Sequence, residues 1–145
     1  MNSETNGYSL EDQIGFLLRK AHQRHRVIFS RVVEQRIAPQ QFAALAKLGS
    51  IGPTSQNLLG RLLAMDAATI QGVVERLRAQ GLVKRRRDPE DARLRVVELT
   101  DTGSGLLEEL LPLAVKITAE TLAPLGADDE DTLVDLLRRI SSDPE

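Results

Sequence analysis

The sequence predicts a mainly α-helical fold with one small β-hairpin wing, in the chain order of a winged helix-turn-helix. Three observations predict this fold class. Residues 81–99 (GLVKRRRDPEDARLRVVEL) have the composition of two short strands around a turn. Residues 37–80 carry apolar positions at helical spacing in short segments, and longer helical stripes lie before and after this region.

Length and composition predict an ordinary globular chain of one compact domain. Its 145 residues are 41% hydrophobic and 28% charged, with a net charge of −2. The absence of cysteine excludes disulfides, thiolate catalysis and zinc sites that need sulfur, and we expect no cofactor. The first residues lack a basic leader, and no apolar run is long enough to span a membrane. We therefore expect a cytoplasmic protein without a membrane partner.

The first helix is expected to begin after Ser9, whose hydroxyl would cap an acidic first turn, and to run to about Glu34. One side of this helix is apolar at spacings of three and four residues, and we expect that side to be buried. The apolar side consists of Ile14, Leu17, Leu18, Ala21, His25, Ile28, Phe29 and Val32.

Three shorter helices are expected next. Pro39 occupies the favoured first-turn position of the second helix, which ends within residues 49–53. Residues 54–56 open the third helix, and Asp66 caps the fourth, which ends at Gly81. The expected inner positions are Phe42, Ala43, Leu45, Ala46 and Leu48, then Leu58, Leu59, Leu62 and Leu63, then Ile70, Val73, Val74 and Leu77.

The hairpin begins at Gly81, where the end of a helix favours a residue that tolerates positive φ. Residues 88–91 supply turn chemistry before a return strand with Leu94, Val96, Val97 and Leu99 as its apolar positions. The density of cations in this segment suits contacts to phosphate, although a hairpin that faces only water is the alternative. The cations are Lys84, Arg85, Arg86, Arg87, Arg93 and Arg95.

A long fifth helix is expected after residues 100–102, which offer a new cap. Pro112 should bend this helix gently, because proline lacks a backbone N–H. A last helix is expected over residues 128–140, capped by an acidic cluster. The expected buried stripes are Leu106, Leu110, Leu111, Ala114, Ile117 and Leu122 in the fifth helix and Leu133, Leu136, Leu137 and Ile140 in the last.

Charge is polarised along the chain, because the hairpin is basic and the C-terminal stretch is acidic. This polarity favours a nucleic-acid partner for the hairpin, although the net charge alone does not. The acidic residues of the C-terminal stretch are Glu120, Asp128, Asp129, Glu130, Asp131, Asp135, Asp143 and Glu145, against Arg138 and Arg139.

The first and last helices carry more apolar surface than a small helical unit can bury. We expect partner helices of a second subunit to cover that surface in a two-fold homodimer, and the alternative is a bundle within one chain. The expected organisation is an N-terminal dimerisation and ligand helix (residues 1–36), a DNA-binding region (residues 37–100) and C-terminal dimerisation helices (residues 101–145).

The chain resembles the MarR family of bacterial transcription regulators over residues 10–141. Residues 38–45 (APQQFAAL) resemble the family's start of the second helix, with alanine where threonine is usual. Residues 75–85 (ERLRAQGLVKR) resemble the end of the recognition helix and the beginning of the wing. Residues 88–93 (DPEDAR) and 97–103 (VELTDTG) are similar to the family's D-x-R wing and LT-x-x-G motifs. The resemblance implies a homodimer with interlocked terminal helices and repression that a ligand relieves.

The fourth helix is expected to enter the major groove of a pseudo-palindromic operator, with its N-terminal residues at base edges. Gln71 suits a bidentate contact to adenine, and Arg93 suits insertion into a narrow minor groove with Asp91 shaping the wing. Alternatively, Asp91 and Arg93 form a purely structural pair, and Arg76 pairs with Glu75 or Asp66 instead of phosphate. The expected DNA contacts are Ser55, Gln56, Ala68, Thr69, Gln71, Gly72, Arg76, Arg86, Arg87, Asp91 and Arg93.

The two histidines, His22 and His25, stand three residues apart on the first helix beside apolar and basic residues. The resemblance implies aromatic carboxylate effectors, such as hydroxylated benzoates, cinnamates or nicotinates, with Arg19 or Arg26 meeting the carboxylate. Alternatives are surface histidines without a ligand and a metal-sensing site. The expected ligand contacts are Leu18, Arg19, His22, His25, Arg26, Phe29, Phe42 and Leu45.

No constellation in the sequence predicts an enzyme. Residues 103–105 (GSG) lack the lysine of a phosphate-binding loop, and the acidic pair Asp128–Asp129 is explained by helix capping. The principal competing function is a winged-helix module that binds protein instead of DNA, without catalysis. Steep salt dependence of binding to duplex DNA would distinguish the two.

Overall fold

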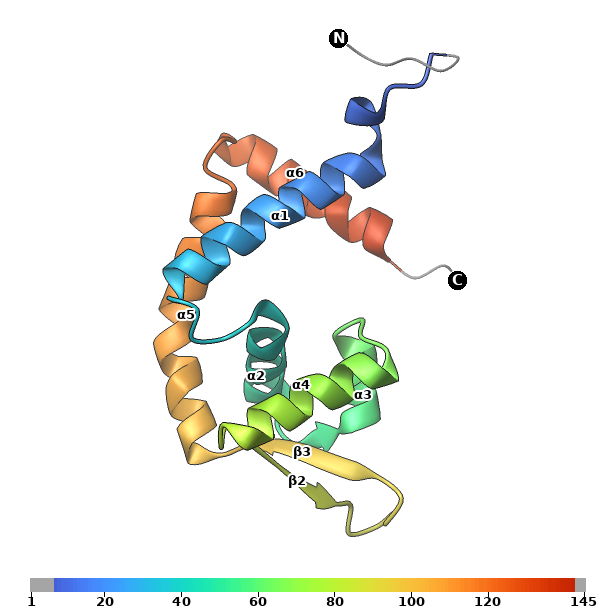
Figure 1. The fold of residues 1–145 in the computed structure, drawn as a ribbon, viewed down its shortest axis with the longest axis vertical. Helices are drawn as coiled ribbons and strands as arrows, with labels where there is room; N and C mark the ends of the chain where they lie inside the picture. The colour runs from blue at the N-terminus through green and yellow to red at the C-terminus, as the bar shows by residue number, and fades with distance from the viewer. Residues whose placement is uncertain (1–6, 143–145) are drawn as a thin grey trace. The chain divides into compact units, whose positions relative to one another are not determined.

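The computed structural model describes residues 7–142 and confirms the mainly helical fold with a small antiparallel sheet (Figure 1). A short 3-10 turn, Leu10–Asp12, precedes the first helix. Asp143 and Glu145 of the acidic C-terminal stretch lie outside the described residues. The helices are α1 (Ile14–Val32), α2 (Pro39–Ile51), α3 (Gln56–Leu62), α4 (Ala67–Ala79), α5 (Asp101–Thr121) and α6 (Ala127–Ser141), and the strands are β1 (Thr54–Ser55), β2 (Val83–Arg87) and β3 (Arg95–Leu99).

The chain forms two compact units. The first unit contains the described residues up to Ile28 and those from Val115 onward, and the second unit runs from Phe29 to Ala114. The second unit holds α2, α3, α4 and the whole sheet, so the segment expected to bind DNA lies within it. Helices α1 and α5 contribute residues to both units.

The core of the second unit confirms the expected face of α4. Ile70, Val73, Val74 and Leu77 are all buried, and they pack where α4 meets α2, α3 and β2. The side chain of Asp66 accepts a hydrogen bond from the backbone N–H of Thr69 at 2.7 Å, as a helix cap should. In α2 the buried residues are Gln41, Ala44, Leu45 and Leu48, whereas Phe42, Ala43 and Ala46 are half-buried.

The sheet has the strand order β1-β3-β2, with both pairings antiparallel. The hairpin of β2 and β3 confirms the expected wing, with Arg85 opposite Val97. Residues 54–56 open α3 as expected, but Thr54 and Ser55 also form a short strand that pairs with Val97 and Val96, which the sequence did not predict. Helix α3 begins one residue later, and the Ser55 hydroxyl caps it by accepting from the N–H of Leu58.

The start of the first helix also differs from expectation. The Ser9 hydroxyl donates to the Glu11 carboxylate at 3.3 Å and caps no helix, because residues 10–12 form a separate 3-10 turn. Helix α1 ends at Val32, since Glu34 and Gln35 adopt positive φ angles of 56° and 59°. These left-handed residues end the helix at that point.

Many apolar positions expected to be buried are exposed in the chain. Helix α3 buries Leu59 and Gly60 and leaves Leu58 and Leu62 exposed, and α6 contains no buried residue. The described part of the chain offers no element to cover these faces. The exposed residues are Ile14, Leu17, Leu18, Ala21, Leu58, Leu62, Leu111, Leu136, Leu137 and Ile140, while Leu63 and Leu133 are half-buried.

A junction between the hairpin and α5 closes the second unit. Thr100 caps α5 by accepting from the N–H of Gly103 at 3.0 Å, and its hydroxyl donates to the carbonyl of Gly81 at 2.6 Å. Gly81 has a φ of 74°, as expected for the residue after a helix. The N–H of Thr100 donates to the Leu82 carbonyl at 3.1 Å, and α5 then continues through Pro112 without interruption.

Substitution of Gly103 by alanine should destabilise the protein by about 1–3 kcal/mol or more. A Cβ atom at Gly103 would overlap the backbone carbonyl of Leu82, which cannot move without breaking the junction. Gly105→Ala is the matched control, because nothing lies within 4 Å of its Cβ position and alanine favours the helix. Chemical denaturation of both variants tests this prediction, and equal unfolding free energies would contradict it.

Candidate nucleic-acid interface

The N-terminus of α4 presents small and polar residues to solvent. Ala67 and Ala68 are exposed, and Thr69 is held by Asp66, whose pKa is lowered by hydrogen bonds from the Thr69 backbone N–H and hydroxyl. Gln71 is exposed and Gly72 is half-buried on the same helix. A helix N-terminus with small side chains allows close approach to a nucleic-acid surface.

A closed ring of hydrogen bonds joins α3, α4 and β2. Arg85 Nη1 donates to Gln56 Oε1 at 3.3 Å, and Gln56 Nε2 donates to Gln71 Oε1 at 2.6 Å. Gln71 Nε2 donates to Glu75 Oε1 at 3.4 Å, and Arg85 Nη1 pairs with the same Glu75 oxygen at 3.0 Å. The structure thus brings together two expected contact residues, Gln56 and Gln71. Glu75 and Arg85 close the ring, and the sequence analysis missed their roles.

Glu75 has different partners from the one considered in the sequence analysis. Its carboxylate pairs with Arg78 and Arg85, each at 3.0 Å. Among the described residues Arg76 forms no ion pair, and its guanidinium lies near Gly72, where a Cβ atom would be 3.5 Å from Nη1. Arg76 is therefore available for a contact outside the chain.

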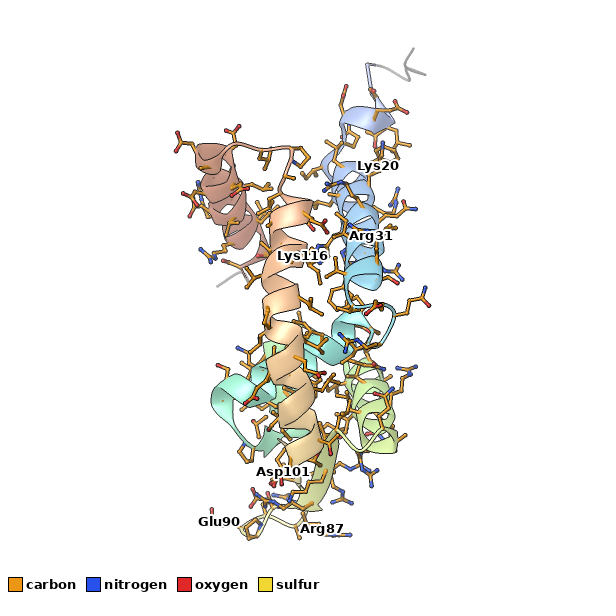
Figure 2. The ribbon with its side chains drawn as sticks, turned by 90° about the vertical axis from the view of Figure 1, so that its left-hand side faces the viewer. Lys20, Arg31, Arg87, Glu90, Asp101 and Lys116 are labelled. Atoms are coloured by element: carbon orange, nitrogen blue, oxygen red, sulfur yellow. The ribbon has the colours of Figure 1, made fainter. Side chains whose placement is uncertain are left out.

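The cations of the hairpin differ in their partners. Glu98 pairs with Lys84 at 3.3 Å and with Arg86 at 3.0 Å, and these contacts lower the pKa of the Glu98 carboxyl, the Arg86 hydrogen bond contributing most. Arg87 and Arg95 instead contact the carbonyl oxygen of Ala92. Positive charge without an acidic partner therefore gathers toward the far end of the hairpin, where Figure 2 shows Arg87.

The turn at that end is shaped by two aspartates. Asp88 Oδ1 accepts from the N–H groups of Glu90 at 2.7 Å and Asp91 at 3.1 Å. Asp91 accepts from the Arg93 backbone and, in a two-point contact, from its guanidinium at 3.1 Å, which lowers the pKa of Asp91 and raises that of Arg93. The Arg93 side chain is nevertheless 89% exposed, so Asp91 orients it without burying it.

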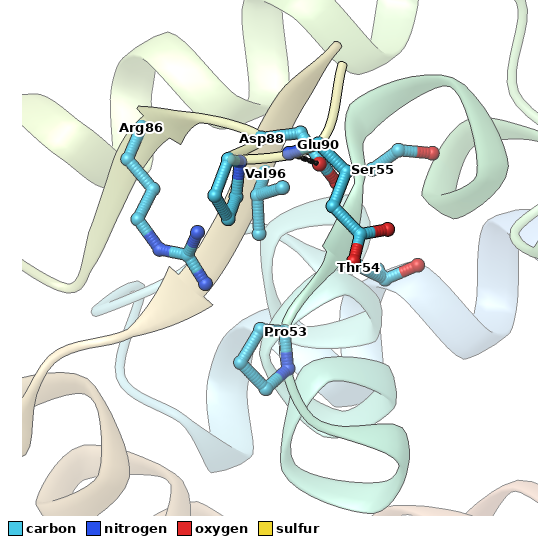
Figure 3. Close-up of a pocket in the computed structure, with 8 residues that line it drawn as sticks. Pro53, Thr54, Ser55, Arg86, Asp88, Glu90 and Val96 are labelled. Atoms are coloured by element: carbon cyan, nitrogen blue, oxygen red, sulfur yellow. Dashed lines mark hydrogen bonds between the residues drawn. The ribbon is translucent and has the colours of Figure 1, made fainter. Parts of the chain in front are cut away.

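A hollow of about 400 Å³ lies between this turn and β1 (Figure 3). Arg86 and Glu90 lie on the hairpin side, and Pro53, Thr54 and Ser55 lie on the β1 side. Two polar side chains at this hollow have partners within the chain, because Arg86 donates to Glu98 and Ser55 caps α3.

One expected effector residue of α1, His25, makes a polar contact within the first unit. His25 Nδ1 lies 2.9 Å from the Thr121 hydroxyl, and the neighbouring Arg24 donates to the Glu120 carbonyl at 3.0 Å and to that of Thr121. Partial burial, and secondly the charge of His22, lower the pKa of His25. The sequence analysis missed Arg24 and Thr121, because residues about 97 positions apart leave no local signal.

The other expected effector residues have varied surroundings. In the first unit, Leu18, Arg19, His22 and Arg26 are exposed, and Arg19 lies over the Phe16 ring at 5.7 Å. In the second unit, the Phe29 and Phe42 rings are 6.0 Å apart, and Leu45 is completely buried in the core.

Residues 7–142 contain neither a metal cluster nor a membrane-spanning helix. No group of three or more His, Cys, Asp or Glu side chains there could hold a metal ion, so His22 and His25 have no third ligand. No helix in that part of the chain combines the length and apolar character needed to cross a membrane.

Comparisons with known proteins find similar transcriptional regulators. The family model described as MarR family matches residues 37–94. The HTH-type transcriptional repressor NicR of Pseudomonas putida is 40% identical over 139 residues, covering 95% of this chain and 88% of the relative. A crystal structure of a probable transcriptional regulator from Pseudomonas aeruginosa is 49% identical, with a TM-score of 0.87, over 90% of this chain and 98% of that one.

A third similar protein links the fold to a small ligand. It is BpsR of Bordetella bronchiseptica, whose structure concerns the regulation of its DNA binding by 6-hydroxynicotinic acid. It is 37% identical, with a TM-score of 0.90, and the match covers 94% of this chain and 99% of BpsR.

Proposed function

The chain belongs to the MarR family of transcriptional regulators, and from this premise we propose that it is a homodimeric repressor of a pseudo-palindromic operator, released by a small aromatic carboxylate. The observation that carries the proposal is the second unit, which presents the N-terminus of α4 beside a hairpin whose end carries exposed arginine side chains. A recognition helix and a basic wing together are typical of DNA-binding winged helices.

The proposed DNA contacts divide into three kinds. At base edges we place Gln71, with Ala68, Thr69 and Gly72 allowing close approach. Phosphate contacts come from Arg76, Arg87 and the α3 start, and Arg86 would first have to leave Glu98. Arg93 enters the minor groove, oriented by Asp91. The full proposed set is Ser55, Gln56, Ala68, Thr69, Gln71, Gly72, Arg76, Arg86, Arg87, Asp91 and Arg93.

The apolar faces of the terminal helices support the homodimer. Helix α6 buries none of its residues within the chain, although Leu136, Leu137 and Ile140 follow helical spacing on it. Helix α1 likewise exposes Ile14 and Leu17. Contiguous apolar surface of this kind is typical of subunit interfaces, and a two-fold dimer would match a palindromic operator.

The proposed effector is a hydroxylated nicotinate, benzoate or cinnamate. BpsR supports this class, because 6-hydroxynicotinic acid regulates its binding to DNA. In this chain, Arg19 and Arg26 on α1 supply cations for the carboxylate, and His22 and His25 supply hydrogen-bonding groups for a ring substituent. His25 is already held at the Thr121 hydroxyl, which favours one orientation of its ring.

Salt-dependent DNA binding and its relief by an aromatic acid test the proposed function directly. The protein should bind its own upstream DNA tightly in fluorescence anisotropy, with affinity that falls steeply as salt rises. One or more acids from a panel of hydroxylated nicotinates, benzoates and cinnamates should weaken binding, and a His22→Ala/His25→Ala double variant should respond less.

The outcomes of this experiment separate the alternatives. Binding that no acid changes would overturn the effector and its site but leave the repressor. Failure to bind duplex DNA, with a partner protein bound instead, would favour the interaction module.

Arg93→Ala should weaken operator binding by about 1–3 kcal/mol, because it removes the exposed guanidinium at the end of the wing. The free energy of unfolding should change little, since the Asp91–Arg93 pair is exposed. Arg36→Ala is the matched control, because it removes the same charge from a residue that pairs with Glu109 on α5. A loss of stability without a loss of affinity would instead assign the pair a purely structural role.

Ile140→Asp should shift the protein from dimer to monomer, raising the dimer dissociation constant about tenfold or more. The reason is that a charge placed in an apolar interface loses its hydration. Thr132→Asp adds the same charge at another exposed position of α6 and should leave the dimer intact. Sedimentation equilibrium measures both, and a wild-type protein that is monomeric at micromolar concentration would refute the homodimer.

A further inference from the structure

The ring of Gln56, Gln71, Glu75 and Arg85 has a fixed hydrogen-bond direction. Arg85 has no acceptor and the ionised Glu75 carboxylate has no donor. The Arg85 guanidinium must therefore donate to the Gln56 oxygen, and the Gln71 nitrogen must donate to Glu75. The Gln56 nitrogen is then left to donate to the Gln71 oxygen, and these two atoms lie 2.6 Å apart. The two charges thus determine which way both amides point.

The Gln71 amide keeps hydrogen-bonding capacity within the ring. An amide oxygen has two lone pairs and an amide nitrogen has two hydrogens. Gln56 occupies one lone pair of Gln71 at 2.6 Å, and Glu75 takes one hydrogen at 3.4 Å. Arg85 Nη1 also lies 3.5 Å from the Gln71 oxygen, but its two hydrogens serve the shorter contacts to Gln56 at 3.3 Å and Glu75 at 3.0 Å. One acceptor and one donor remain on the exposed Gln71 side chain.

One acceptor and one donor on a single amide are what a bidentate contact to an adenine edge requires. We propose that Gln56 is a positioning residue for sequence recognition: from α3 it holds the Gln71 amide of α4 in the orientation that reads adenine, within a ring closed by Glu75 and Arg85. This inference rests on the proposed DNA-binding function. An amide held in advance loses less rotational freedom on binding and cannot easily present its two ends in reverse.

A simple phosphate contact by Gln56 makes different predictions. Such a contact would contribute equally on every DNA sequence and would act independently of Gln71. A positioning residue would instead affect discrimination at the one base pair that Gln71 reads. The energies of the two substitutions would then not add, because they act through one contact.

The test begins with a duplex selected by the wild-type protein from a random-sequence library, followed by all single-base variants of that duplex. Gln71→Ala should lower discrimination at one adenine position about tenfold. Gln56→Ala should lower discrimination several-fold at that same position and not elsewhere, and the double variant should equal Gln71→Ala.

Two further variants sharpen the test. Gln56→Glu preserves the side-chain volume and the acceptor for Arg85 but cannot donate to Gln71, so it should also lose discrimination at that position. Gln40→Ala, at an exposed glutamine of α2, is the matched control and should discriminate as the wild type does.

Each outcome has a distinct meaning. If the wild-type protein selects no sequence, the proposed function fails before the inference is reached. If it selects one, but Gln56→Ala weakens all duplexes equally and adds to Gln71→Ala, the positioning role is overturned. The positioning role is also overturned if Gln71→Ala loses discrimination at no single base pair.

Discussion

The wing depends on the close contact between the first turn of α5 and the backbone at the end of α4. Gly103 packs against the carbonyl group of Leu82, and Thr100 holds the carbonyl of Gly81 while capping α5. Both ends of the hairpin are therefore tied to each other and to two helices. A two-stranded hairpin is marginally stable alone, and here the junction supports it together with the pairing of β3 with β1. The recognition surface requires α4 and the wing to be held in one arrangement.

The distribution of charge within the second unit matters more than the net charge of −2. Acidic residues neutralise the cations at the base of the hairpin, where Glu98 meets Lys84 and Arg86 and Glu75 meets Arg85. Lys84 and Arg86 are themselves exposed, so their pairs with Glu98 contribute little to stability, whereas Arg85 is mostly covered and stays within its ring with Glu75. Toward the end of the hairpin the arginines contact backbone carbonyls or are oriented by Asp91. The wing is thus ordered at its base and presents exposed arginines, Arg87, Arg93 and Arg95, toward its end.

The terminal helices combine polar anchoring with uncovered apolar surface. In the first unit, Arg24 and His25 attach α1 to the last residues of α5 through backbone carbonyls and a hydroxyl. Leu136, Leu137 and Ile140 of α6, by contrast, remain exposed in the described part of the chain. A ligand that altered the contacts of His25 would act on a helix that also supplies apolar surface for a partner subunit. This link would connect effector binding to the dimer, on which an operator with two half-sites depends.

The sequence by itself determined the elements whose signals are local. Asp66, Pro39, Thr100 and Gly81 act on backbone groups within a few residues, and the helix and hairpin boundaries they predict agree closely with the structure. The β2–β3 hairpin follows from its apolar and turn residues, and the buried face of α4 follows from periodicity, because a regular helix repeats its environment along the chain.

Only the tertiary structure decided the contacts between residues distant in sequence. The pairing of Thr54 with Val97, the ring in which Arg85 meets Gln56 across 29 positions, and the attachment of Arg24 to Thr121 required the elements to be packed first. The exposed stripe of α6 shows the same limit, since an amphipathic pattern identifies a face that must be covered but does not say which chain covers it.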